Sequence, residues 1–184
     1  MGRWRPRAPL LFVLLEAEPL KASSVTALCV RVVCVWMILI AGQASAIDIV
    51  ASGNWLVTND ASDLIGGAGT DLTDTYSSTS EEVLITISNT AGVGDNWRVD
   101  IKKTITSWPP GVSLYARRTG DGTGSGSIVN GMSYTLIEAT DTSFFSGSGD
   151  RSSIPIQLRI TGATVGFGPS TYSLTVTYTV VDTA

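Results

Sequence analysis

The chain has 184 residues, with 12 Lys and Arg, 16 Asp and Glu, and no histidine. The absence of histidine excludes Ser-His-Asp and Cys-His catalysis and histidine-ligated zinc. Charge is unevenly distributed, because residues 47–184 contain seven basic and fourteen acidic residues, a formal net charge of −7. Such a surface repels phosphate backbones and anionic lipid, so a nucleic-acid partner and an anionic membrane surface are not expected.

Residues 1–46 have the pattern of a secretion signal. Val32–Ile40 is an uninterrupted apolar run, Arg31 directly precedes it, and Ala44-Ser45-Ala46 supplies the small residues that signal peptidase reads. The run is shorter than the roughly 20 residues that cross a bilayer, so an uncleaved anchor is the less favoured alternative and we expect no integral membrane span in the mature chain. We predict a secreted or cell-surface protein.

The start of this segment is unusual for a signal peptide. Residues 1–24 make it long and include two acids, Glu16 and Glu18, so we predict that translation begins downstream, near Val25. Both cysteines, Cys29 and Cys34, precede residue 47. The mature domain, residues 47–184, is therefore expected to fold as a single unit without disulfides.

Apolar and polar residues alternate repeatedly after residue 46, which is the pattern of strands with one buried and one wet face. A clear example is Tyr172–Val180, where Leu174, Val176 and Tyr178 alternate with threonines. Seven strands are predicted, at residues 47–58, 83–88, 97–106, 112–117, 132–136, 154–161 and 172–180. Pro155 lacks the ladder donor, which predicts that its strand is at a sheet edge or begins at that residue.

Gly, Ser, Asp and Pro cluster between these strands and predict loops. The loops are at residues 59–80, 108–111, 120–127 and 147–153, and the third and fourth are expected to be flexible. Seven short strands at such spacing predict an all-β fold, an antiparallel two-sheet sandwich of immunoglobulin-like or jelly-roll-like type. A barrel is the alternative.

Four carboxylates lie in the loop that follows the first predicted strand. They belong to Asp60, Asp63, Asp71 and Asp74. Calcium binds several oxygen ligands, so these residues are the candidate calcium site, although their spacing matches no named calcium motif. The competing interpretation is a solvated acidic loop, and no other cofactor is expected.

Aromatic residues offer a candidate ligand-binding platform. Trp108 adjoins two prolines in a predicted loop, and Tyr115 follows on the next strand, so these two residues are the candidates for stacking against a glycan. Trp55 and Trp97 fall on apolar strand faces and are expected in the core.

The closing segment Gly168–Thr179, GPSTYSLTVTYT, resembles the last strand of secreted bacterial surface sandwiches of the pilin-like and spore-coat-U-like type. The chain departs from those families because residues 47–184 contain no cysteine pair and no penultimate tyrosine. The resemblance implies assembly by donor-strand exchange, for which residues 47–58 would be the donor strand.

These observations favour a secreted or cell-surface, non-enzymatic structural protein that acts through strand edges. Its partners would be copies of itself or other surface proteins. A carbohydrate-binding or adhesive module, assisted by calcium, is the alternative. An enzyme is the least favoured class, because the sequence contains no histidine and no recognisable pair of catalytic carboxylates.

Overall fold

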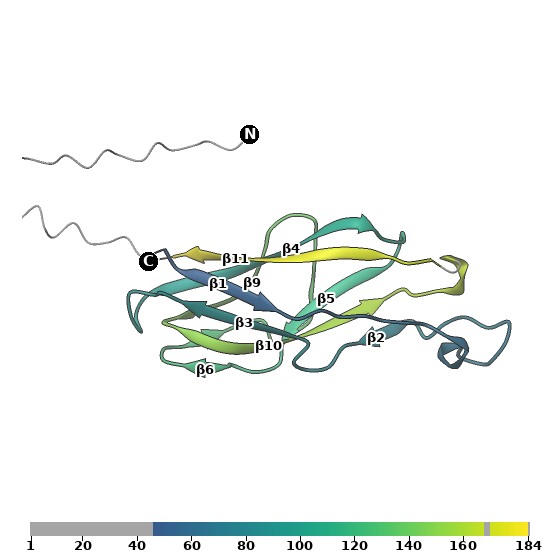
Figure 1. Cartoon of the computed structure of the whole chain (residues 1–184), viewed down its shortest axis with the longest axis horizontal. Coiled ribbons are helices and arrows are strands. Elements are labelled where there is room, and N and C mark those ends of the chain that lie inside the picture. Colours follow the sequence, from purple (N-terminus) through teal and green to yellow (C-terminus); the bar gives the residue numbers. More distant parts are fainter. Residues whose placement is uncertain (1–45, 168–169, 184) are drawn as a thin grey trace, which may run out of the picture. The chain divides into compact units, whose positions relative to one another are not determined.

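Two antiparallel sheets packed face to face make up the fold of the computed structural model, which describes residues 46–167 and 170–183 (Figure 1). These residues belong to one compact unit, Ala44–Ala184. The all-β, two-sheet prediction is confirmed. The signal segment and the alternative start at Val25 lie outside the described residues, apart from Ala46. Within the described ranges, no helix has the length and apolar character needed to cross a membrane.

The first sheet has seven strands and the second has four. Along the first sheet the order is β1 (Asp48–Ser52), β3 (Val83–Ser88), β10 (Arg151–Thr161), β5 (Ser113–Arg118) and β8 (Thr135–Leu136), while β2 (Thr75–Ser77) and β6 (Thr123–Gly124) pair with the two ends of β10. Along the second the order is β11 (Ser173–Asp182), β4 (Asn96–Ser107), β9 (Thr142–Ser148) and β7 (Ile128–Val129). Two short 3₁₀ turns, η1 (Ala61–Asp63) and η2 (Val165–Phe167), occur in the loops.

The period-two pattern places the core between the sheets. In β3 and β5 every second residue is buried and the residues between them face outward, and β10 follows the same pattern from Ile154 to Leu158. Trp97 of β4 and Phe145 of β9 are both fully buried and meet edge to face, with ring centroids 6.1 Å apart. The Trp97 indole N–H donates to the carbonyl of Gly149 at 2.8 Å, so this large ring is buried without an unsatisfied donor.

The prediction for Pro155 is wrong, because Pro155 is the fifth residue of β10, which pairs with β3 on one side and β5 on the other. The carbonyl of Pro155 accepts from the amide of Thr119, one residue beyond the end of β5. In an antiparallel ladder the N–H and C=O of a residue point to the same side. The missing donor of Pro155 therefore falls where β5 has already ended, and the central strand loses no ladder bond.

Two loops predicted to be flexible are ordered by pairing. Residues 147–153 contain the end of β9 and the start of β10, with only Gly149 and Asp150 between them. Residues 120–127 include β6, and buried Arg118 holds the first of them by donating to the carbonyl of Gly120. Arg151 donates to the carbonyl of Gly126 at the other end of this loop. Hydrogen bonds from these two buried guanidinium groups therefore hold a loop that its glycine content predicted to be flexible.

The first predicted strand is shorter than its alternation indicated. β1 pairs with β3 over Asp48–Ser52 and stops before Gly53, whose φ is +144°. A Cβ at Gly53 would lie 2.1 Å from the carbonyl oxygen of Glu82, so only glycine fits here. After Gly53 the chain no longer pairs with β3 and leaves the first sheet.

Candidate functional site: an apolar cleft beside an open strand edge

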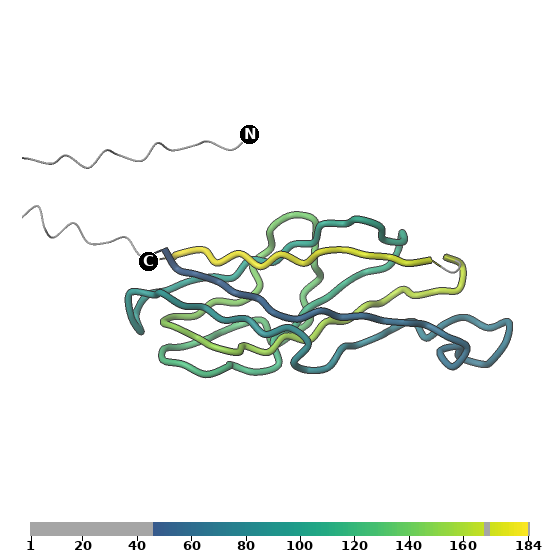
Figure 2. Tube along the Cα trace, in the orientation of Figure 1, coloured from purple at the N-terminus to yellow at the C-terminus, as the bar shows by residue number. Residues whose placement is uncertain are grey.

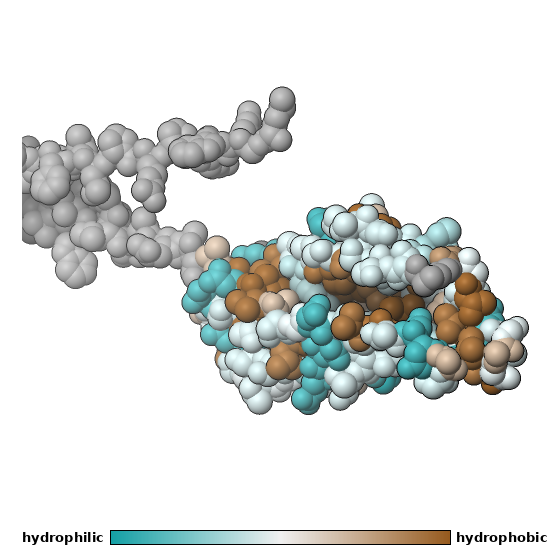
Figure 3. Space-filling view, turned by 45° about the vertical axis from the view of Figure 1, so that its right-hand side comes forward, coloured by the Kyte–Doolittle hydropathy of each residue, from teal (hydrophilic) through white to brown (hydrophobic). Residues whose placement is uncertain are grey.

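The two sheets separate at one end, and the space between them is a cleft of about 1180 Å³. Its walls come from both sheets and from the loops at that end. Figure 3 shows hydrophobic side chains gathered in a hollow on this face of the domain. The apolar and aromatic side chains that line it include Leu114, Leu158 and Ile160 from the first sheet and Leu174, Val176 and Tyr178 from β11.

β11 is the outermost strand of its sheet. Its ten residues pair with β4 over their whole length, and no described strand pairs with its other edge. β1 lies beside β11 near the C-terminal end of that strand (Figure 2), but the two strands belong to different sheets. The N-terminal half of β11, which lines the cleft, therefore presents unpaired backbone groups along the rim.

The extended segment Gly53–Asn59 crosses this cleft. Trp55 and Val57 point inward and are partly buried, whereas the side chain between them, Leu56, is 81 % exposed. Among the described residues this segment has no backbone hydrogen bond to another part of the chain. Side-chain packing, chiefly that of Trp55 against the core, holds it against the domain.

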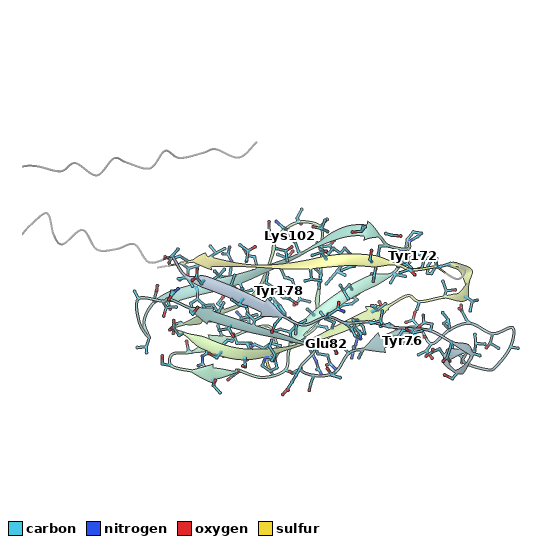
Figure 4. All side chains as sticks on the ribbon, in the orientation of Figure 1. Tyr76, Glu82, Lys102, Tyr172 and Tyr178 are labelled. Atoms are coloured by element: carbon cyan, nitrogen blue, oxygen red, sulfur yellow. The ribbon has the colours of Figure 1, made fainter. Side chains whose placement is uncertain are left out.

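Two tyrosines that line the cleft, Tyr76 and Tyr178, have buried hydroxyl groups, and Figure 4 labels both residues. The hydroxyl of Tyr178 has no hydrogen-bond partner within the described structure, and burial raises its pKa. Burial also raises the pKa of Tyr76, and the negative charge of Asp63 adds to this effect. A buried hydroxyl without a partner costs free energy, so Tyr178 places an unsatisfied polar group in the interior beside the cleft.

The predicted platform residues occupy different faces. Trp108 lines the cleft, and its indole N–H donates to the carbonyl of Val112 at 2.8 Å within its own loop. Tyr115 lies on the outer face of β5, where its cross-strand partner is Arg159. The structure does not bring Trp108 and Tyr115 together. The alternation in the sequence already predicted that Tyr115 lies on the polar face of its strand and Leu114 on the apolar face.

The four predicted calcium ligands have separate partners. Asp60 caps η1 by accepting from the amide of Ser62, and the amide of Asp60 donates in turn to Asp63. The hydroxyl of Ser62, and after it the Ser62 amide, donate to the Asp60 carboxylate and hold its pKa below the usual value. Within the described residues, no group of three or more His, Cys, Asp or Glu side chains has the arrangement of a metal site.

The other two aspartates tie the acidic loop to the loop before β11. Asp71 accepts from the amide of Val165 at 2.9 Å and from the hydroxyl of Thr164, and Asp74 accepts from the amide of Gly162 at 3.0 Å. The Val165 bond is the largest cause that lowers the pKa of Asp71. These carboxylates brace the loops at the cleft end of the domain.

No protein-family model, curated protein or solved structure matches this chain. Function is therefore inferred from the chain's own geometry. Sequence reasoning missed the cleft because segments more than 100 residues apart line it. The signal that was available is the pair Trp55 and Val57, which continue the apolar alternation of β1 past the point where pairing ends.

Proposed function

We propose that this chain is an exported, non-enzymatic structural protein whose copies join by strand addition along β11. The observation that carries the proposal is the position of the open β11 edge directly on the rim of the apolar cleft. An extended segment placed there would pair with the backbone of β11 and bury its alternate side chains in the cleft. A small apolar ligand would fill the cleft but leave the strand edge unpaired.

The donor that we propose is residues 47–58 of a neighbouring copy. Half of this segment, β1, is hydrogen-bonded to β3 of its own domain, and the other half, from Gly53, has no ladder bonds. The second half can therefore leave its own cleft without breaking strand pairing. Trp55 and Val57 of the neighbour would then occupy the positions that the same residues fill within one chain.

The export part of the proposal rests on the N-terminal sequence pattern. The apolar run after Arg31 and the small residues before Ile47 are the features that support it. The resemblance of the last strand to pilin-like and spore-coat-U-like proteins points to the same class. An assembly protein at the cell surface would also account for rows of threonine on β11 that carry no catalytic chemistry.

The test is the state of association of the purified full chain. Light scattering after size exclusion, with negative-stain microscopy of the same sample, should reveal polymers or filaments. A synthetic peptide of residues 47–58 should shorten them by capping free clefts. The matched control is the same peptide with Trp55→Ser and Val57→Ser, which keeps the length and loses the buried side chains.

A stable monomer at high concentration would overturn the proposal. So would polymers that the two peptides affect equally, because the cleft would then not be the point of contact.

A further inference from the structure

The outer face of the first sheet carries a group of three side chains that the strand-edge proposal does not use. The guanidinium carbon of Arg159 lies 3.7 Å from the centroid of the Tyr134 ring, and that of Arg117 lies 4.8 Å from the same centroid. Both guanidinium groups therefore contact the same aromatic ring and lie close to each other. We call Arg117, Tyr134 and Arg159 the arginine–tyrosine cluster.

Hydrogen bonds fix the cluster in place. The side-chain oxygen of Gln157 accepts from the Tyr134 hydroxyl at 2.8 Å and from Arg117 Nε at 2.9 Å. Gln157 Nε2 donates to the carbonyl of Ser78, and Arg159 Nε donates to the hydroxyl of Ser77. The Nε atom of each arginine is therefore held by a hydrogen bond. The terminal Nη groups of both arginines have no hydrogen-bond partner among the described residues.

Neither arginine of the cluster has a carboxylate partner. The ion pairs among described residues involve other cations, namely Arg98 with Asp100, Lys102 with Asp141, and Arg118 with Asp121. In a domain with twice as many acids as bases, two adjacent unpaired guanidinium groups are unexpected. The Tyr134 ring that both groups contact offsets only part of their mutual repulsion, and an anion bound to both would relieve the rest.

We propose that the arginine–tyrosine cluster binds a carboxylated sugar, such as a hexuronate unit of a surface polysaccharide. A guanidinium group presents parallel N–H donors that match the two oxygens of a carboxylate. Tyr115 lies beside Arg159 across the strands and offers an aromatic ring for the apolar face of a sugar. This site is on the opposite side of the sheet from the core and is independent of strand addition.

Other anions fit the surroundings less well. A nucleic acid or polyphosphate carries dense negative charge, which the domain's net charge of −7 repels. An acidic peptide offers carboxylates, but it has no apolar sugar face that could stack against the ring of Tyr115. A sugar with one carboxylate per ring supplies an anion for the two arginines at a lower charge density than a nucleic acid or polyphosphate. Its ring can also lie against a flat sheet face.

The test is calorimetric titration of the full chain with trigalacturonate, followed by ¹⁵N spectra of the arginine Nε–H groups. Binding should shift the Arg117 and Arg159 signals. Arg159→Gln and Arg117→Gln should each weaken affinity at least about tenfold, since each removes charged hydrogen bonds. Arg159→Lys keeps the charge but loses the planar fork, and should fall between wild type and Arg159→Gln.

The matched control is Lys102→Gln, which removes one positive charge from the other sheet and should leave affinity unchanged. Circular dichroism should show that every variant keeps the fold. The proposal is overturned if neutral trigalactose binds as well as trigalacturonate, or if Lys102→Gln weakens binding as much as Arg159→Gln. Tighter binding of triglutamate, or no trigalacturonate binding at millimolar concentration, would also overturn it.

Discussion

At the scale of single residues, the core depends on Gly147 as much as on the aromatic side chains. Gly147 lies opposite Trp97 in the β4–β9 ladder, and a Cβ at this position would lie 2.5 Å from the edge of the Trp97 ring and 2.6 Å from the carbonyl oxygen of Ser127. The glycine is needed for space, because the indole ring occupies the volume that a side chain would fill.

We therefore predict that Gly147→Ala destabilises the domain by about 1–3 kcal/mol, the usual cost of overpacking a core. Urea unfolding followed by tryptophan fluorescence measures this change. Gly94→Ala is the control, because nothing lies within 4 Å of the Cβ it would add, and its effect should stay within about 0.5 kcal/mol. Equal effects of the two substitutions would show that Trp97 does not constrain this position.

Asp71 gives a prediction about pH at the same scale. Its pKa is lowered from 3.8 chiefly by the hydrogen bond from the Val165 amide. A carboxylate with a lowered pKa in the folded state stabilises that state above its unfolded pKa, and the contribution is lost as pH falls through the folded pKa. The link between the acidic loop and η2 should therefore loosen below about pH 4.

The amide resonance of Val165 reports this loosening, because its hydrogen bond to Asp71 weakens on protonation. Its chemical shift should titrate at acid pH in the wild type and stay flat in Asp71→Asn. The Thr90 amide, which donates to Asp150, is an internal control that should still titrate in the variant. An unchanged Val165 titration in Asp71→Asn would assign the effect to another group.

At the scale of elements, β10 organises the first sheet, since β2, β3, β5 and β6 all pair with it. Ile156 lies in its centre, paired with Val83 on one side and Arg118 on the other, and is fully buried. We predict that Ile156→Ala costs about 2–5 kcal/mol, the range for emptying a well-packed site.

The matched control for this prediction is Ile105→Ala on β4. It deletes the same atoms from a side chain that is 51 % exposed and should cost well under half as much in thermal or urea unfolding. If both variants lost similar stability, β10 would not be the central element of the fold.

Strands whose alternation is regular and long were predictable from the sequence. β3 coincides with its predicted range, and β4, β5, β10 and β11 differ from theirs only at the ends. β9 was missed because Phe144 and Phe145 are adjacent and both buried, at a register shift opposite Val99 and Asp100. A bulge breaks the period of two, so alternation cannot reveal such a strand.

The sites were less predictable than the strands, because tertiary placement forms them. Tyr134 comes from a loop, and nothing in its local sequence indicates that its ring reaches Arg117 and Arg159. The cleft depends on where β1 stops pairing, which the close approach of Gly53 to Glu82 decides. Trp108 lies in a loop, as predicted, and its role in binding a ligand stays a prediction.

At the scale of the whole molecule, net charge should act on the two proposed contacts in opposite directions. Two copies of the domain, residues 47–184, each carry a charge of −7 and repel one another as they approach, whereas the arginine–tyrosine cluster attracts a carboxylate. Salt screens both interactions, and the screening length falls from about 30 Å at 0.01 M to about 3 Å at 1 M.

We therefore predict that raising the salt concentration from about 0.01 to 1 M strengthens self-association and weakens trigalacturonate binding. Sedimentation velocity measures the first change and calorimetry the second. The double variant Glu81→Gln, Glu138→Gln removes two exposed negative charges, so its association should begin at lower salt than that of the wild type. Association that weakens as salt rises would mean that ion pairs hold the copies together. Strand addition depends on backbone pairing and apolar burial, which salt does not weaken, so that result would count directly against β11 as the joining edge.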